Sequence, residues 1–397
     1  MQKFDLKKID LKSFDFKKLD KKQKMIAAGI GALVVIVIAF LSMPGSTDIQ
    51  HKTQAPIASN VYEINDEASF IEKTTRQQIM PFNRPDLEFQ INVPTNWEIE
   101  NLSTNITPDF SQKILSDIVQ IKSPLFVTSR AEINVRSLVL EHEISAKNWL
   151  RNYIQSNGYV LHGDVEEKDE KRASAYYSRI ENLQNLHVYI TVQFTGNMAL
   201  LAQFVSPLPV KEYLSFLQKR MIDSFQTTLN NNKTIEEKRI FTLIDAIKFE
   251  YPVSWEITAP DFRDMSRLSV QILNKNSAGT TEGYIGFIAI RRSRNTDIRK
   301  EFDELKKFFA EKVKIEFSKL IAIERPKVTD RFIFSRLERY EAKSTEKLRI
   351  PQEIRLLALG DKEWYIFIYM ISPTETANLY NWARNSHSFD VIMQSVR

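Results

Sequence analysis

The 397-residue sequence contains no cysteine. It therefore has no disulfide framework, no thiolate nucleophile and no cysteine-ligated metal site. Glycine and histidine are scarce, at ten and five residues, and there is no glycine-rich phosphate loop, no H-E-x-x-H zinc helix and no G-x-S-x-G elbow. We interpret His51, His142, His162, His187 and His387 as surface or packed side chains. The sequence thus predicts no catalytic residue, no metal site and no cofactor, and it argues against an enzyme.

Excess charge is confined to one short segment. The formal net charge is +5, and residues 1–24 carry all of it with nine Lys and four Asp. The rest of the chain holds 46 basic and 46 acidic side chains. A nucleic-acid-binding protein carries its positive charge on a folded face or a longer basic arm. The charge distribution therefore argues against nucleic acid as a partner.

Residues 25–43 form a long apolar run, MIAAGIGALVVIVIAFLSM, nineteen residues without a charge. As a helix the run would span about 28 Å, close to the thickness of the bilayer hydrocarbon core. Lys21, Lys22 and Lys24 precede it, whereas 44–48 contain no basic residue. By the positive-inside rule, the N-terminus stays in the cytosol and the C-terminal body lies across the membrane.

The competing interpretation of this run is a cleaved signal peptide. Its apolar region would then be unusually long, its charged region would be 24 residues, and Phe40-Leu41-Ser42-Met43 lacks a good small-x-small cleavage site. An uncleaved transmembrane helix at 25–43 is the favoured reading.

The tail at 1–24 is a degenerate five-residue repeat in which apolar, acidic, apolar and basic residues follow one another. Because five residues turn a helix by about 140°, the apolar positions do not gather on one helical face. One interpretation is a solvated tail that meets anionic lipid headgroups, at about 1 kcal/mol per lysine, through Lys17, Lys18, Lys21, Lys22 and Lys24. The other is a linear motif that docks on a cytosolic protein through Phe4, Leu6, Ile9, Leu11, Phe14 and Phe16. Both stay open.

The body beyond the polar linker at 44–60 repeats itself. FQINVPTNWEI at 89–99 returns as IKFEYPVSWEI at 247–257, a separation of 158 residues. Four further matches follow in the same order: 118–121 with 269–272, 131–136 with 284–291, 204–207 with 370–373, and Ser224-Phe225 with Ser388-Phe389. We therefore expect one domain at 61–229, a linker at 230–236 and a second domain at 237–397.

Each copy reads as strands with alternating apolar residues, helical runs at 145–156 or 297–313, and a closing helix. This order predicts an α+β fold of two tandem antiparallel sheets flanked by helices, plus the N-terminal transmembrane helix. Pro94 and Pro252 are expected to end a strand, and Trp97 and Trp255 to cover the sheet edge, burying about 200 Å² each. A ligand site at these positions is the less favoured alternative. The charged run at 164–172 is expected to be a solvated loop or helix face.

The pattern hydrophobic-x-hydrophobic-x-(Val/Tyr)-Pro-x-x-Trp at the start of a sheet, with Ser-Phe in the closing helix, resembles the Mog1/PsbP/DcrB-like superfamily. The resemblance covers nearly the whole body, twice, and implies an antiparallel sheet between helices. Relatives include photosystem accessory subunits, nuclear-transport factors, bacterial envelope lipoproteins and chaperone-adaptors of secreted toxins, so the resemblance does not fix a function. The chain departs from the lipoproteins because it has no cysteine to carry a lipid.

Two functions are expected from these features. The first is a non-enzymatic, single-pass subunit of the bacterial inner membrane. Its two periplasmic domains and its cytosolic tail bind other protein subunits of an envelope-spanning assembly, such as a secretion machine. An oligomer within that assembly is compatible with this role. The second is a membrane-tethered chaperone or small-ligand-binding module of the periplasm. A large exposed apolar patch would favour protein partners, and a concave pocket of roughly 300–1,000 Å³ would favour the ligand.

Overall fold

The computed structural model describes residues 64–102, 115–125, 130–229, 234–294, 296–315, 317–342 and 350–397. The predicted tail, transmembrane helix and linker at 1–60 lie outside the described residues, as do all the lysines and apolar anchors assigned to the tail. Within the described ranges, every helix is too short or too polar to cross a bilayer. The described chain consists mainly of antiparallel sheet with five α-helices, an α+β fold.

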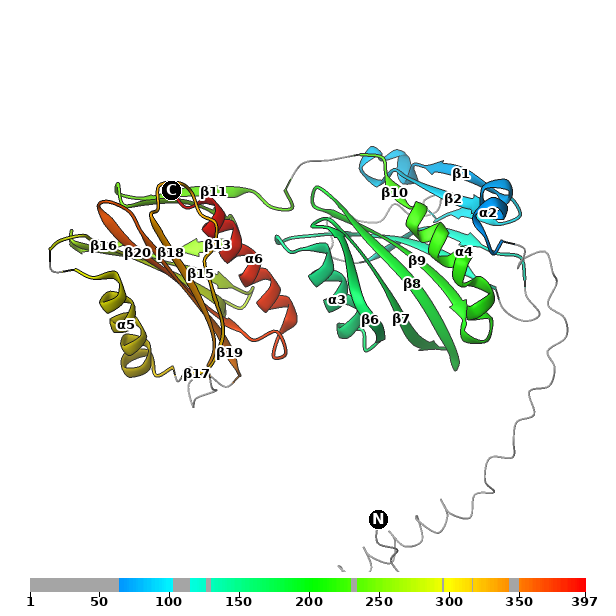
Figure 1. Ribbon diagram of the computed structural model, residues 1–397. Coiled ribbons are helices and arrows are strands. Elements are labelled where there is room, and N and C mark those ends of the chain that lie inside the picture. The colour runs from blue at the N-terminus through cyan, green and yellow to red at the C-terminus, as the bar shows by residue number, and fades with distance from the viewer. Residues whose placement is uncertain are drawn as a thin grey trace, which may run out of the picture. The chain divides into compact units, whose positions relative to one another are not determined.

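The first large sheet has seven antiparallel strands (Figure 1). Their order is β3 (Glu98–Asn101), β4 (Ser116–Lys122), β5 (Glu132–Val139), β9 (Met198–Pro207), β8 (Gln184–Thr195), β7 (Arg172–Glu181) and β6 (Val160–Asp169). Apolar side chains alternate along β8, so Val188, Ile190 and Val192 share one face. That face packs against helix α3 (Ala146–Ser156), which begins where the Ser145 hydroxyl accepts a hydrogen bond from the Asn148 N–H.

The opposite face of this sheet carries helix α4 (Lys211–Ser224), which contacts β8, β9 and β2. Strands β1 (Thr74–Ile79), β2 (Phe89–Pro94) and β10 (Gln226–Thr227) form a separate three-stranded sheet, preceded by helix α2 (Glu67–Lys73). Strand β2 lies in the middle of this small sheet, and its side chains Phe89, Ile91 and Val93 are all buried.

The second large sheet repeats the strand order of the first. It runs β13 (Trp255–Ile257), β15 (Arg267–Lys275), β16 (Thr281–Arg291), β20 (Trp364–Pro373), β19 (Gln352–Gly360), β18 (Phe334–Ala342) and β17 (Phe317–Glu324), with β14 (Asp261–Asp264) also paired to β15. A hairpin of β11 (Lys238–Leu243) and β12 (Ile247–Pro252) stands where β1 and β2 stand in the first half.

Two helices cover the two faces of the second sheet. Ile285, Phe287 and Ala289 of β16 belong to a core that includes residues of helix α6 (Leu379–Ser395). Tyr284 and Ile288, on the other face, pack in a second core with helix α5 (Ile298–Phe308). A π-helical turn, Phe309–Val313, continues α5 and ends at Lys314, whose φ of 62° is left-handed.

The Pro-x-x-Trp segments lie where strand pairing ends. Pro94 is the last residue of β2 and Pro252 the last of β12. The Trp97 N–H donates to the Pro94 carbonyl at 3.0 Å, which closes a tight turn, and Trp97 packs on Phe204 with ring centroids 5.7 Å apart. Trp255 is buried in the α6-side core. Both indoles therefore contribute to packing.

The expected match between Ser224 and Ser388 is wrong. Ser224 Oγ accepts a hydrogen bond from the Asn92 N–H of β2 at 2.9 Å, and Ser395 Oγ does the same for the Glu250 N–H of β12 at 2.9 Å. Ser388 lies in the middle of α6 instead. The letters Ser-Phe recur there by coincidence, and the structural counterpart of Ser224 is Ser395.

The run at 164–172 is neither a loop nor a helix face. It forms the exposed end of β6, the turn at Glu170 and Lys171, and the start of β7. Strand β6 is the last strand of its sheet, and charge along such an edge discourages pairing with another chain. The charged side chains therefore disfavour the pairing of β6 with a strand of another chain.

Candidate functional site

Two hollows lie between helix α5 and the second sheet. Their volumes are about 810 Å³ and about 460 Å³. Gln271, Phe308 and Tyr369 line both hollows, so the two adjoin along these side chains. Together we call them the α5 groove. Strands β15, β16 and β20 supply one wall, and the end of α5 with the π-helical turn supplies another. Gln352 of β19 and Asn378 and Asn381 at the start of α6 also line the larger hollow.

One side of the smaller hollow is apolar. Ile288, Leu305 and Phe308 line it, and Phe308 exposes 48% of its surface although its neighbour Phe309 is buried. Phe309 packs edge-on against Tyr369 with ring centroids 4.9 Å apart. The π-helical turn places one aromatic ring in the core and leaves the ring beside it available for contact.

Two tyrosines form the polar centre of the groove. The hydroxyls of Tyr284 and Tyr369 are 3.1 Å apart and share a hydrogen bond. Burial raises the pKa of both phenols; the neighbouring Tyr369 adds to the rise for Tyr284, whereas the hydrogen bond with Tyr284 partly offsets the rise for Tyr369. Both are therefore protonated at neutral pH. Among the described residues neither hydroxyl has a further hydrogen-bond partner, so one of the two phenolic protons remains for an acceptor on a ligand.

Gly286 makes room for this arrangement. It lies directly opposite Tyr369 in the pairing of β16 with β20. A Cβ atom at Gly286 would collide with the Tyr369 ring. The Tyr369 ring can lie across the β16 backbone because Gly286 has no side chain.

The ends of the groove carry charge, mostly acidic. Asp261, Asp264 and Arg267 line the smaller hollow and Glu282 the larger. Arg267 forms a 3.4 Å ion pair with Glu301. Hydrogen bonds from the Ser266 hydroxyl and N–H lower the pKa of Asp264, which keeps it ionised at neutral pH.

At the matching positions of the first sheet, the side-chain amides donate hydrogen bonds within that half. Across β4, β5 and β9, Gln120, Asn134 and Gln203 lie side by side, in the positions that Gln271, Gly286 and Tyr369 hold in the second sheet. Gln120 and Asn134 both donate to Glu132, at 3.0 and 2.9 Å. Gln203 donates to the hydroxyl of Tyr153, a residue of α3, at 2.9 Å. In contrast, the Gln271 amide has no hydrogen-bond partner in the described part of the chain.

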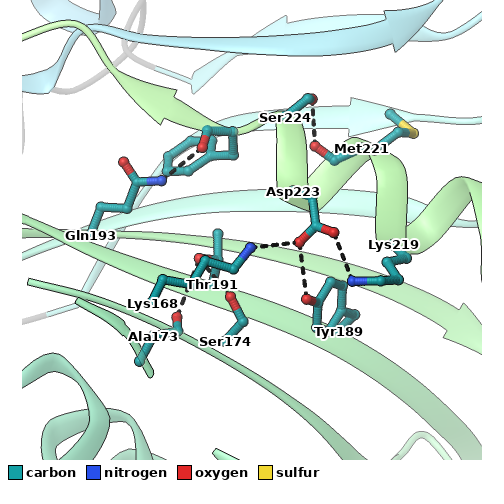
Figure 2. Close-up of polar contacts among 11 residues, drawn as sticks. Lys168, Ala173, Ser174, Tyr189, Thr191, Gln193, Lys219, Met221, Asp223 and Ser224 are labelled. Atoms are coloured by element: carbon teal, nitrogen blue, oxygen red, sulfur yellow. Dashed lines mark hydrogen bonds and ion pairs between the residues drawn. The ribbon is translucent and has the colours of Figure 1, made fainter. Parts of the chain in front are cut away.

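A second polar cluster lies under α4 in the first half (Figure 2). The Asp223 carboxylate pairs with Lys168 and Lys219, both at 2.8 Å, and accepts a hydrogen bond from the Tyr189 hydroxyl at 3.1 Å. Burial opposes ionisation of Asp223, but the two lysines outweigh it and hold its pKa below the usual value. With three partners the carboxylate is satisfied, so the cluster fastens α4 to the sheet.

Strand β8 also carries a buried histidine on the α4 face. Burial lowers the pKa of His187 to about 4, with the charges of Lys211 and His162 acting in the same direction. His187 is therefore neutral at physiological pH. Its ring stacks on Tyr176 with centroids 5.5 Å apart, which is a packing role.

None of the site residues predicted from the sequence lines the α5 groove. Pro94, Trp97, Pro252 and Trp255 lie in turns and cores, and the tail positions lie outside the described residues. The groove was missed in the sequence because its polar centre joins Tyr284 and Tyr369, which are 85 positions apart. The available signal was a pair of glycines, Gly283 and Gly286, inside one strand of a chain with ten glycines.

No family model matches the sequence, and no curated protein matches it either. Solved structures with some likeness include a cyanobacterial PsbP (CyanoP) from Synechocystis, 9% identical over 39% of this chain and 92% of that one, with a TM-score of 0.28. A protein from Bacteroides thetaiotaomicron is 12% identical over 43% of this chain and 55% of its own, with a TM-score of 0.25. The immunity protein TplEi of T6SS from Pseudomonas aeruginosa is 8% identical over 82% and 96%, with a TM-score of 0.22. A PsbP protein is thus among the structural neighbours, and scores this low assign the chain to no family.

Proposed function

We propose that this protein is a non-enzymatic binding protein that holds a ligand in the α5 groove of its second half. The observation that carries the proposal is the larger hollow of about 810 Å³. Ligand sites in proteins have volumes of about 300–1,000 Å³, with apolar walls and a few polar groups that set orientation. The Tyr284–Tyr369 pair and the Gln271 amide are such groups.

The two tyrosines of the groove are hydrogen-bond donors rather than bases. A general base must lose its proton near the working pH. Burial raises the pKa of Tyr284 and Tyr369, so neither phenol becomes a base at neutral pH. Arg267 is paired with Glu301. These side chains offer hydrogen bonds and charge to a bound ligand.

The test of this function uses full-length protein, purified in mild detergent and released from the micelle in a native mass spectrometer. We expect a ligand mass on the wild-type chain. Gln271→Trp fills the junction of the two hollows and should remove that mass. Gln120→Trp, at the matching position of the first sheet, is the control and should keep it. The proposal is wrong if the wild type carries no ligand, or if Gln271→Trp retains it.

We propose a second function, that of a membrane-anchored accessory subunit, because of one edge strand. Leu320, Ile321 and Ile323 of β17 are 45%, 39% and 53% exposed on the last strand of the second sheet. An apolar edge strand is a template on which an extended segment of another protein can add a strand. Strand β6, at the same place in the first sheet, is guarded by charge.

In this second proposal, two tandem Mog1/PsbP-like domains stand in the periplasm on a single transmembrane helix at 25–43. The domains and the cytosolic tail contact other subunits of an envelope-spanning assembly, and the tail lysines contact anionic lipid headgroups. The N-terminus is cytosolic and the protein is resident in the inner membrane.

Affinity purification of the full chain with mass spectrometry tests this role. We expect co-purifying subunits that are lost in the variant Leu320→Lys/Ile323→Lys and kept in Val160→Lys, an exposed position on β6. Replacing the six apolar tail anchors by Ser should abolish recruitment and leave membrane insertion intact. Recovery of the wild-type chain alone excludes the subunit role.

A further inference from the structure

The polar centre of the α5 groove matches a peptide group. A peptide bond offers a carbonyl that accepts a hydrogen bond and an N–H that donates one. The Tyr284–Tyr369 pair retains one phenolic proton for a carbonyl, and the Gln271 amide, without a partner among the described residues, can both donate and accept. Tyr369 is only 6% exposed and lines both hollows, so a bond to it would be formed away from water.

The apolar side of the smaller hollow matches an apolar side chain of the ligand. The half-exposed ring of Phe308 faces the same hollow as Ile288 and Leu305. Covering such surface contributes about 25 cal/mol per Å² of apolar area removed from water. An aliphatic or aromatic side chain next to the peptide group would cover it.

The charge of the lining selects among peptides. Among the described side chains, Asp261, Asp264 and Glu282 line the groove with one base, Arg267, which gives this described lining a formal charge of −2. The acidic groups lie at both ends, since Glu282 lines the larger hollow and the two aspartates line the smaller. A basic side chain on either side of the apolar residue would meet a carboxylate, whereas an acidic one would be repelled.

Resting on the ligand-binding function proposed above, we infer that the ligand of the α5 groove is an extended peptide segment with an apolar side chain and a nearby lysine or arginine. In the first sheet, the side-chain amides of Gln120, Asn134 and Gln203 at the matching positions already donate hydrogen bonds within their own half.

Calorimetric titration of the full-length protein in mild detergent tests this inference. The probes are two capped hexapeptides with a central phenylalanine, one with lysine and one with glutamate two positions away, and a dodecylammonium salt. We expect the lysine peptide to bind about three- to fivefold more tightly than the glutamate peptide, the size of a surface ion pair. The preference should shrink as salt is raised.

Two substitutions locate the charge contacts. Asp264→Asn and Glu282→Gln keep the hydrogen-bonding shape of each side chain and remove its charge, so one or both should abolish the preference for lysine. Asp303→Asn, on the exposed side of α5 and 66% exposed, is the control and should not change it. Tyr369→Phe should weaken both peptides alike, because the phenolic proton serves the peptide carbonyl.

The outcomes separate the ligand class from the function. Equal affinity for the two peptides, or binding of dodecylammonium alone, overturns the peptide inference. If neither peptide binds but the native ligand mass is still lost in Gln271→Trp and kept in Gln120→Trp, the peptide class is wrong and the binding function stands. If that mass behaves alike in both variants, the binding function itself fails.

Discussion

Tyr369 lies across Gly286 at the centre of the second sheet, and its ring occupies the space that any side chain at Gly286 would need. The position of Tyr369 in the groove thus depends on the backbone at Gly286, because the Tyr369 hydroxyl shares a hydrogen bond with Tyr284 and its ring packs against Phe309. In the first sheet the matching pair is Asn134 and Gln203, two polar side chains of ordinary size.

Gly286→Ala should therefore destabilise the protein. The added methyl group displaces the Tyr369 ring, and overpacking of this kind costs about 1–3 kcal/mol. Urea unfolding followed by tryptophan fluorescence measures the loss. Gly360→Ala is the matched control, since a Cβ there meets its neighbours only at ordinary contact distances of 3.4–3.6 Å. Equal stability of the two variants would contradict the close approach described for Gly286.

The tyrosine pair should show energetic coupling. Tyr284→Phe and Tyr369→Phe each remove the same hydrogen bond, so the double variant should lose less than the sum of the single losses. We expect a coupling energy of about 0.5–1.5 kcal/mol in the free energy of unfolding. A coupling near zero would mean that the two hydroxyls do not bond in solution.

His187 predicts a pH dependence of stability. The unfolded chain takes up a proton on this side chain near pH 6.5, but the folded chain does so only at about 4. Between these values the unfolded state binds more protons, so the stabilising contribution is present above about pH 6.5 and is lost as the pH falls toward 4.

His187→Phe, which keeps a ring against Tyr176, should remove this dependence. The free energy of unfolding of the wild type should fall relative to the variant by at most about 3 kcal/mol between pH 7 and pH 4. Urea unfolding at several pH values gives the difference. Parallel curves for the two proteins would show that His187 titrates normally in the folded state.

The Asp223 cluster predicts a loss of stability at neutral pH. Asp223→Asn removes two ion pairs and weakens the bond from Tyr189, and the lysines left behind can reach water. We expect a cost of about 1–2 kcal/mol. Because the folded pKa is depressed, the contribution is present above the ordinary value near 3.9 and is lost as the pH falls below it. Glu212→Gln, an exposed change on the same helix, should stay within about 0.5 kcal/mol of the wild type.

The two serines that end α4 and α6 should have equal effects. Ser224→Ala and Ser395→Ala each leave a strand N–H without its acceptor, which costs about 1–3 kcal/mol. Ser215→Ala, on the exposed side of α4, is the control. If Ser388→Ala proved as costly as Ser224→Ala while Ser395→Ala did not, the sequence-based match would be right and the structural one wrong.

Alternating apolar residues correctly predicted strands at 131–136 and 284–291, because burial of one face imposes a period of two on a strand. The helical runs at 145–156 and 297–313 correspond to α3 and to α5 with its π-helical turn. The sequence pattern did not correctly match the residues that end the closing helices of the two halves. Ser224 is the last residue of α4 and Ser395 the last of α6, so the match of letters at Ser388 located the second serine about two turns too early. Only the hydrogen bond to β12 identifies Ser395.

The α5 groove could not be predicted in the same way. Gln120 and Gln271 occur in similar sequences, Ile-Val-Gln-Ile and Ser-Val-Gln-Ile. One is bonded to Glu132 and the other lines a hollow, and the difference arises from residues on neighbouring strands, Asn134 in one case and Gly286 in the other. Cross-strand neighbours are set by register, which a single stretch of sequence does not contain.

A shared strand order within one polypeptide also creates a hazard during synthesis. A strand of the half made first can pair with an unfinished sheet of the half made later, the failure that is characteristic of repeated folds. Here the cross-strand neighbours at the centres of the two sheets, Asn134 with Gln203 and Gly286 with Tyr369, do not fit in exchanged pairs. A β9 segment inserted beside β16 would place Gln203 over Gly286 and leave a void where an aromatic ring belongs, whereas β20 beside β5 would force that ring onto Asn134. The divergence that opened one groove and closed the other therefore also helps each half to select its own strands.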